Sequence, residues 1–144
     1  MKNKYHKDVH YICKLPCREK IEKIYGKLKN YDVVLTDERK THILNRRKND
    51  GIDVLINLKD CIRNYDYVID AGDKSIKCIK ISTKRNYAYI IKLSLESHQK
   101  ANSVISGMII GKKKVNKYIS TKRIIHIRKV KKWNSITSHS NFRF

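Results

Sequence analysis

His42 and Arg46 are the two residues of this chain whose types and spacing best fit chemistry on a phosphodiester. Residues four apart lie on one side of an α-helix, so the two side chains would project together. An imidazole titrates near neutral pH and can move a proton, and a guanidinium can hold a phosphate oxygen in bidentate fashion. The plainer alternative for each is a solvated side chain on a helix surface.

The chain is strongly basic, and its charge is unevenly distributed. Its 144 residues include 34 Lys and Arg against 13 Asp and Glu, a formal net charge of +21. The first 72 residues hold 16 basic and 11 acidic side chains, whereas the last 72 hold 18 basic ones and only two acids, Asp73 and Glu96. Such a half-chain repels itself when compact unless a polyanion neutralises it. Nucleic acid is the polyanion we expect, with an anionic membrane surface as the alternative.

Chemistry on a phosphodiester needs groups that can move protons and cations that can hold the charged phosphate oxygens. We expect His42 to move a proton and Arg46 to bind phosphate, and His98, in a polar loop, is a candidate second acid or base. Arg47 lies about 100° further round the helix, and Lys92 is the odd charge in an apolar strand, so either could face RNA. Further cations expected to contact the phosphate backbone, or else to be merely solvated, are Lys84, Arg85, Lys112, Lys113, Lys114 and Lys117.

The four cysteines lack the paired spacing of a zinc ribbon and the density of a disulfide scaffold. One cluster of possible soft ligands, within twelve residues, consists of His6, His10, Cys13 and Cys17. Structural zinc sites draw pairs of ligands from two separate elements, and here one short segment would supply all four. We therefore expect reduced thiols, surface histidines and no metal or other cofactor.

The elements that must position these side chains begin with helices. A polar segment, 1–16, is expected to be irregular, and apolar spacing predicts an amphipathic helix over 18–29. A β-branched strand, 33–36, ends in Thr36-Asp37, two good N-cap residues, so the helix that carries His42 begins there.

Strands dominate after a further helix. We expect Gly51 to end the His42 helix and a second helix to span 54–63. Extended segments follow over 67–69, 75–82, 86–95 and 103–110, and the short link 83–85 predicts an antiparallel hairpin. Alternation puts Tyr87 and Tyr89 on a face with Ile91 and Leu93, which favours core packing over stacking on bases. Residues from 112 onward fit one helical turn or the end of a strand.

The order of these features resembles the phage-type members of the Barnase/EndoU/colicin/RelE-like ribonuclease superfamily. The resemblance covers about 31–118 and rests on the helix with His42-Ile43 and Arg46, the segment 65–69, two long strands, and Asn102-Ser103-Val104-Ile105-Ser106. It implies helices packed on a curved antiparallel sheet, with RNA cut on the open face of that sheet without a metal. His42 and Arg46 match two family positions, Ser106 matches the hydroxyl position, and Arg47 stands where a second histidine would be expected.

By alternation Ser106 should share a face with Val104 and Met108, where its hydroxyl would bond a phosphate oxygen or sit half-buried. We accordingly expect an α+β fold with N-terminal helices packed on the sheet. Its parts would be a basic segment 1–30 with one amphipathic helix, a ribonuclease-like core 31–120 and a basic, loosely held tail 121–144.

The function expected from charge and resemblance together is an endoribonuclease of the toxin or phage-associated kind. Its expected partners are RNA, with tRNA as the first candidate, and an acidic inhibitor protein that covers the basic face. The alternatives are a non-catalytic nucleic-acid-binding protein and a phage structural protein. Because the sequence shows neither a signal peptide nor a transmembrane helix, we expect a cytoplasmic protein without a membrane partner.

Overall fold

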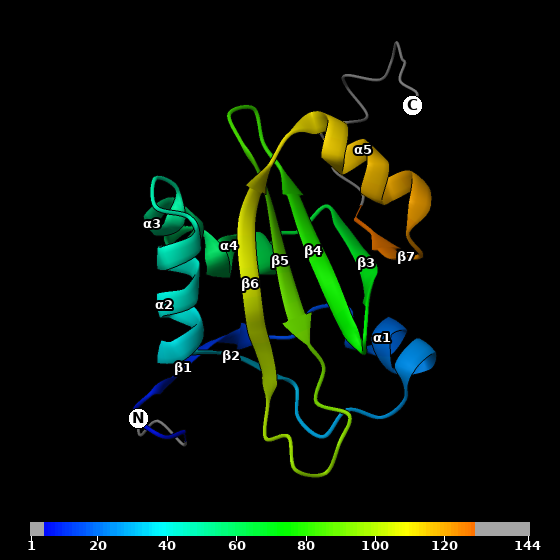
Figure 1. The fold of residues 1–144 in the computed structure, drawn as a ribbon. Helices are drawn as coiled ribbons and strands as arrows, with labels where there is room; N and C mark the ends of the chain where they lie inside the picture. The colour runs from blue at the N-terminus through cyan, green and yellow to red at the C-terminus, as the bar shows by residue number, and fades with distance from the viewer. Residues whose placement is uncertain (1–4, 129–144) are drawn as a thin grey trace.

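A seven-stranded sheet forms the centre of the protein in the computed structural model, which describes residues 5–128 (Figure 1). The strands are β1 (Val9–Lys14), β2 (Asp32–Thr36), β3 (Tyr67–Gly72), β4 (Ser75–Ile81), β5 (Asn86–Lys92), β6 (Asn102–Ile110) and β7 (Ile124–Ile127). The helices are α1 (Arg18–Tyr25), α2 (Asp37–Arg46), α3 (Gly51–Ile56), α4 (Leu58–Arg63) and α5 (Lys112–Thr121). The predicted α+β class is confirmed.

The strand order is β1-β2-β6-β5-β4-β3-β7. Strands β3 to β6 form an antiparallel meander, and the predicted hairpin is present as β4 and β5, paired from Ser75 opposite Lys92 to Ile81 opposite Asn86. The sheet is mostly antiparallel, as expected, except that β2 pairs with β6 in parallel. Parallel neighbours need a long connection, which here runs through three helices and the meander.

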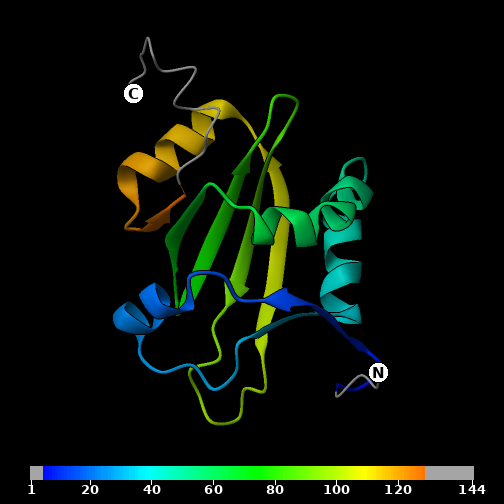
Figure 2. The ribbon, with the colours of Figure 1, turned by 180° about the vertical axis from the view of Figure 1, so that it is seen from behind.

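Helices cover both faces of the sheet. We call the face seen in Figure 1 the front face; Tyr67, Ile79, Ala88 and Met108 form one cross-strand row of it. Figure 2 shows α4 crossing the other, back face, where the first four helices join the larger hydrophobic core. Helix α5 places Val115 in a smaller core on the front face. The expectation that the helices precede the sheet is therefore wrong for α5, which follows β6.

The two ends of the described chain add the edge strands. Strand β1 pairs with β2, so the expectation of an irregular segment is wrong for residues 9–14. Half of its side chains are exposed, as is common on an edge strand. Its sequence therefore lacks the regular apolar alternation that marks a half-buried strand. Strand β7 pairs with β3. Of the expected loose tail, residues 129–144 lie outside the described part. None of the helices described is long and apolar enough to cross a membrane.

The predicted single helix over 54–63 is in fact two short helices separated by Asn57. The Asn57 amide donates to the main-chain oxygen of Asp53 (2.8 Å) and to its carboxylate (2.7 Å), a local bonding pattern that competes with the helical one. Gly51 does not end the His42 helix but begins α3. A Cβ there would lie 3.0 Å from Leu44 Cα, so glycine lets α3 start in close contact with α2.

A bulge in β6 decides which residues share a face. Ser106 lies opposite Ile90 and Val104 lies opposite Ile91, which leaves Ile105 without a partner in the register. Because Ile90 and Ile91 are consecutive on β5, they point to opposite faces. Ser106 is therefore on the front face with Met108, as expected, but Val104 is on the back face, which corrects that part of the expectation.

Candidate functional site

Helix α2 is held beside β6 by the strand that precedes it. Thr36 is its N-cap, as predicted, and its hydroxyl accepts a hydrogen bond from Arg39 N at 3.2 Å. Ile43 is fully buried against the back-face core. Since β2 pairs directly with β6 and runs straight into α2, the helix lies alongside β6 in both ribbon views (Figures 1 and 2).

One side of α2 is a basic ridge made of Arg39, His42 and Arg46. These residues fall at i, i+3 and i+7 and so share a helix face. Arg39 was not singled out from the sequence, although this spacing was the signal that could have found it. Its Nη1 donates to the main-chain carbonyl of Ile105, 3.5 Å away. The ridge therefore borders the bulged part of β6.

The same contact joins α2, three residues before His42, to β6, one residue before Ser106. Helix α2 and strand β6 run in the same direction (Figure 1). Three residues along the helix, from Arg39 to His42, add roughly 4.5 Å. One residue along the strand, from Ile105 to Ser106, adds roughly 3.3 Å. His42 and Ser106 thus lie on neighbouring elements, three helical residues and one strand residue beyond the contact between Arg39 and Ile105.

The polar side chains at this boundary are not used by the fold. Within residues 5–128, the side chains of His42, Arg46 and Ser106 have no hydrogen-bond or ion-pair partner. His42 and Ser106 are half-buried and Arg46 is exposed. All three are therefore available to bind an added group.

Arg47 ends α2 and lies partly against the protein. Its main-chain carbonyl accepts from Asp50 N (3.0 Å) and Gly51 N (2.5 Å), which turns the chain into α3. Its Nε is buried and has no partner in the described part of the chain. Part of the Arg47 guanidinium is therefore buried, whereas a residue that binds RNA is expected to expose the whole group.

Two of the residues predicted to contact RNA form ion pairs with aspartates of the protein. Arg85 pairs with Asp53 at 2.8 Å and with Asp50 at 3.6 Å. Lys92 donates to the main-chain oxygen of Asp73 at 2.7 Å and pairs with its carboxylate at 3.2 Å. Both cations are locally neutralised, so neither is brought to the α2–β6 boundary as a free charge.

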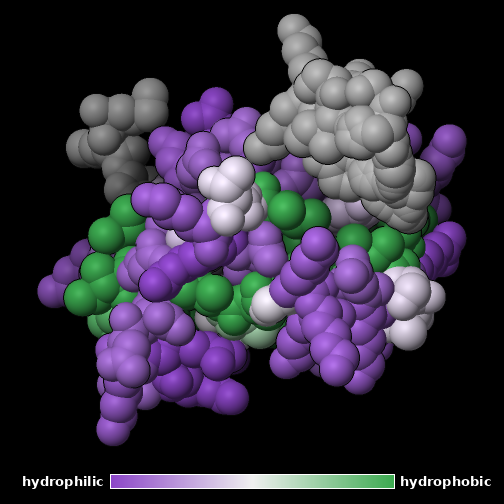
Figure 3. Space-filling model, turned by 90° about the horizontal axis from the view of Figure 1, so that it is seen from above, coloured by the Kyte–Doolittle hydropathy of each residue, from purple (hydrophilic) through white to green (hydrophobic). Residues whose placement is uncertain are grey.

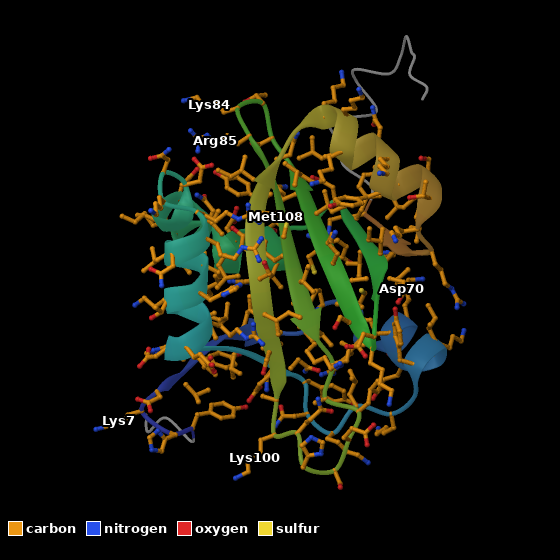
Figure 4. All side chains as sticks on the ribbon, viewed as in Figure 1. Lys7, Asp70, Lys84, Arg85, Lys100 and Met108 are labelled. Atoms are coloured by element: carbon orange, nitrogen blue, oxygen red, sulfur yellow. The ribbon has the colours of Figure 1, made fainter. Side chains whose placement is uncertain are left out.

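The remaining predicted cations are exposed at one end of the sheet. Lys84 lies at the tip of the β4–β5 hairpin, as Figure 4 shows. Lys112, Lys113, Lys114 and Lys117 are exposed on α5, and no acid of the described residues pairs with them. Seen from above, hydrophilic residues cover most of this end, with hydrophobic ones showing between them (Figure 3).

His98 is not brought to His42. It is exposed in the loop that precedes β6, where Lys100 is labelled in Figure 4, at the opposite end of the sheet from Lys84. Its neighbour Glu96 has a lowered pKa, mainly because Lys74 bonds it at 2.8 Å, with His98 as a lesser cause. His98 therefore lies too far from α2 to contact the same phosphate as His42.

The cysteines are thiols of the protein interior. Cys13, Cys61 and Cys78 are buried and Cys17 is half-buried, and none forms a disulfide. Burial raises the pKa of Cys13 to about 11 and that of Cys61 to about 12, so both stay protonated at neutral pH. Among residues 5–128, no group of three or more His, Cys, Asp and Glu side chains could hold a metal ion.

Two cavities lie away from the α2–β6 boundary, and sequence reasoning did not find them. One, of about 340 Å³, has Asp53 on its wall, but that carboxylate already accepts from Tyr87 Oη at 3.0 Å and from Arg85. The other, of about 490 Å³, is bordered by Tyr65 and His126, which are bonded to each other. The Asp53 carboxylate and the Tyr65–His126 pair are thus already bonded within the protein.

Comparison with known family models, curated proteins and solved structures gives no match for this chain. The observations that bear on function are therefore the charge of the chain and the unpartnered side chains where α2 meets β6.

Proposed function

We propose that the protein is an endoribonuclease that cleaves RNA where α2 meets β6, without a metal ion. What supports this proposal is that His42 and Arg46 share a face of α2, that Arg39 of the same face bonds β6 next to Ser106, and that the side chains of His42, Arg46 and Ser106 have no partner among residues 5–128. An imidazole, a guanidinium and a hydroxyl left free at one place suit a reacting phosphodiester.

The chemistry assigned to each side chain follows from its type. The substrate 2′-oxygen forms a bond to phosphorus, the bond from phosphorus to the 5′-oxygen breaks, and the products are a 2′,3′-cyclic phosphate and a 5′-hydroxyl. We assign both proton transfers to His42, which accepts the proton of the 2′-OH and returns it to the departing 5′-oxygen. Arg46 binds a non-bridging oxygen of the phosphorane, and Ser106 donates its hydroxyl to another. Arg39 positions α2 against β6.

The finer fold that we propose is that of the Barnase/EndoU/colicin/RelE-like superfamily. Helices that pack on the back face of the sheet, among them the α2 helix that carries His42 beside β6, are consistent with it. The partners that we propose are RNA, tRNA first, and an acidic inhibitor protein, since an active ribonuclease would damage the RNA of the cytoplasm in which it acts. The unopposed lysines of α5 would attract either one.

The test is cleavage of labelled total RNA by the full chain in EDTA. We expect wild type to give products ending in a 2′,3′-cyclic phosphate, and His42→Ala to be slower by roughly 10²- to 10⁴-fold. His98→Ala is the matched control, because it removes an exposed histidine remote from α2, and it should keep full activity. Equal rates for wild type and His42→Ala, or no cleavage by either, would exclude this function.

The exposed lysines of α5 favour a second candidate, a protein that binds nucleic acid without cutting it. Four exposed lysines on one helix can bind the phosphate backbone of a nucleic acid without any base-specific contact. Strong, salt-dependent binding of RNA or DNA together with intact RNA in the cleavage assay would select this function.

A further inference from the structure

Lys77 on β4 is a buried cation with no carboxylate partner. Its side chain is 8% exposed, and no ion pair or hydrogen bond joins it to another residue of the described part. Its one close partner is the ring of Tyr118 on α5, whose centroid lies 3.5 Å from Lys77 Nζ. A cation–π contact offsets only part of the cost of burying an ammonium group. An apolar side chain at this buried position would make the fold more stable. Residues that lower stability in this way are concentrated at functional sites.

The register of the sheet puts Lys77 in the same row as Ser106. Lys77 lies opposite Ile90, and Ile90 lies opposite Ser106, so all three side chains are on the front face. The outer two are two strand spacings apart, roughly 10 Å between Cα atoms. Ile90, between them, is half-buried. A phosphate over Ile90 would lie within reach of the flexible lysine stem and of the serine hydroxyl.

Basic side chains lie on both sides of this row. Helix α2 brings His42 and Arg46 to the β6 side, and α5 holds the Lys77 ammonium on the β4 side through Tyr118. A phosphorane carries two non-bridging oxygens, and cations placed on both sides stabilise it better than one.

We propose that Lys77 is a phosphate-binding residue of the α2–β6 site, and that Tyr118 is a positioning residue that holds the ammonium toward the front face in the free protein. This inference rests on the proposed function and extends it, because it assigns the cation opposite Arg46. RNA then lies across the front face between α2 and α5, with its phosphodiester above Ile90.

Two measurements on the full chain test the role of Lys77. The first is the affinity for a fluorescent 2′-O-methyl oligoribonucleotide, which cannot be cleaved because its attacking hydroxyl is blocked, at several salt concentrations. The second is cleavage of the unmodified oligonucleotide in EDTA. Lys77→Met removes the charge and keeps a similar stem. We expect it to reduce the slope of log Kd against log salt by about 0.7, the value for one phosphate contact on a single strand, and to reduce kcat/KM by roughly 10²-fold.

The matched control is Lys80→Met. Lys80 is on the same strand but lies opposite Tyr87 on the back face, where it is 3.9 Å from Asp66. It should bind and cleave like wild type. Lys77→Arg keeps the charge and should recover most of the binding and the salt slope. Tyr118→Phe keeps the ring and should behave like wild type. Tyr118→Leu removes the ring, so its salt slope and its kcat/KM should both fall, but by less than in Lys77→Met.

The outcomes separate this inference from the function on which it rests. If folded Lys77→Met binds and cleaves like wild type with an unchanged salt slope, Lys77 does not bind phosphate, and the ribonuclease proposal stands. If Lys77→Arg is as impaired as Lys77→Met, the lysine acts by packing and the inference is wrong. If wild type leaves the unmodified oligonucleotide intact while Lys77→Met still lowers the salt slope, the function fails but the phosphate contact is supported.

Discussion

The guanidinium of Arg39 donates from Nη1 to the main-chain carbonyl of Ile105, 3.5 Å away. Ile105 is the residue that the β6 bulge leaves without a partner on β5. The contact therefore joins the helix that carries His42 to the irregular point of the strand that carries Ser106. It is a structural link between the two halves of the proposed site.

Removing this link should affect activity more than stability. Arg39→Leu keeps much of the stem but loses the donor. The contact is long and only partly buried, so we expect the free energy of unfolding in urea to fall by less than about 1 kcal/mol. Cleavage should slow by at least about 10-fold, because small misplacements of catalytic groups are costly. Lys40→Leu, at the exposed neighbouring position, is the control, and equal cleavage rates for the two variants would show that Arg39 does not position the site.

Local sequence signals were sufficient to predict α2 and its basic side. The N-cap at Thr36 and the spacing of His42 and Arg46 depend on residues within one or two helical turns. Which strand would lie beside that helix depends on the pairing of β2 with β6, residues about 70 positions apart in the chain. No local pattern encodes such a pairing, which explains why the contact of Arg39 was not foreseen.

Asn102 should be essential to the fold rather than to the chemistry. Its buried amide donates to the main-chain oxygens of Asn30 and Asp32, each at 2.9 Å, and its Oδ1 accepts from Ser94 N at 2.8 Å and Ser94 Oγ at 3.0 Å. Asn102→Leu removes all four of these buried hydrogen bonds. We expect the free energy of unfolding to fall by about 3 kcal/mol or more, measured in urea. Asn116→Leu, exposed on α5, should change it little, and a similarly small change for Asn102→Leu would contradict this assignment.

Gly107 should set how closely α3 approaches β6. A Cβ at this position would lie 2.7 Å from the Tyr89 ring and 2.8 Å from Val54 Cγ1, so Gly107→Ala forces one of them to move. We expect a loss of about 1–3 kcal/mol in the free energy of unfolding. Val54→Ala in the same chain should recover part of that loss by making room. Gly111→Ala meets nothing within 4 Å and serves as the tolerated control; equal effects at both glycines would refute the close-contact explanation.

The expectations that proved wrong also depend on contacts between residues far apart in the chain. Strict alternation placed Ser106 and Val104 on one face, and a single unpaired residue in the strand reversed this for Val104. Arg85 and Lys92 looked like free cations, because the acids that neutralise them lie 32 and 19 residues away in the chain. Lys77 looked like one lysine among many in an alternating strand, and only α5, packed above it, shows that it is buried.

His126 should make stability depend on pH. The Tyr65 hydroxyl is hydrogen-bonded to His126 Nδ1, and burial, helped by the charges of Lys20 and Arg128, lowers the pKa of the imidazole below its ordinary value of 6.5. The unfolded chain therefore binds more protons than the native one below about pH 6.5, and the free energy of unfolding must fall as the pH is lowered through that range. His126→Gln keeps an acceptor for Tyr65 without titrating, so its urea unfolding curves should change less between pH 7 and pH 5. His98→Gln is the surface control, and parallel losses in wild type and His126→Gln would assign the acid sensitivity to other groups.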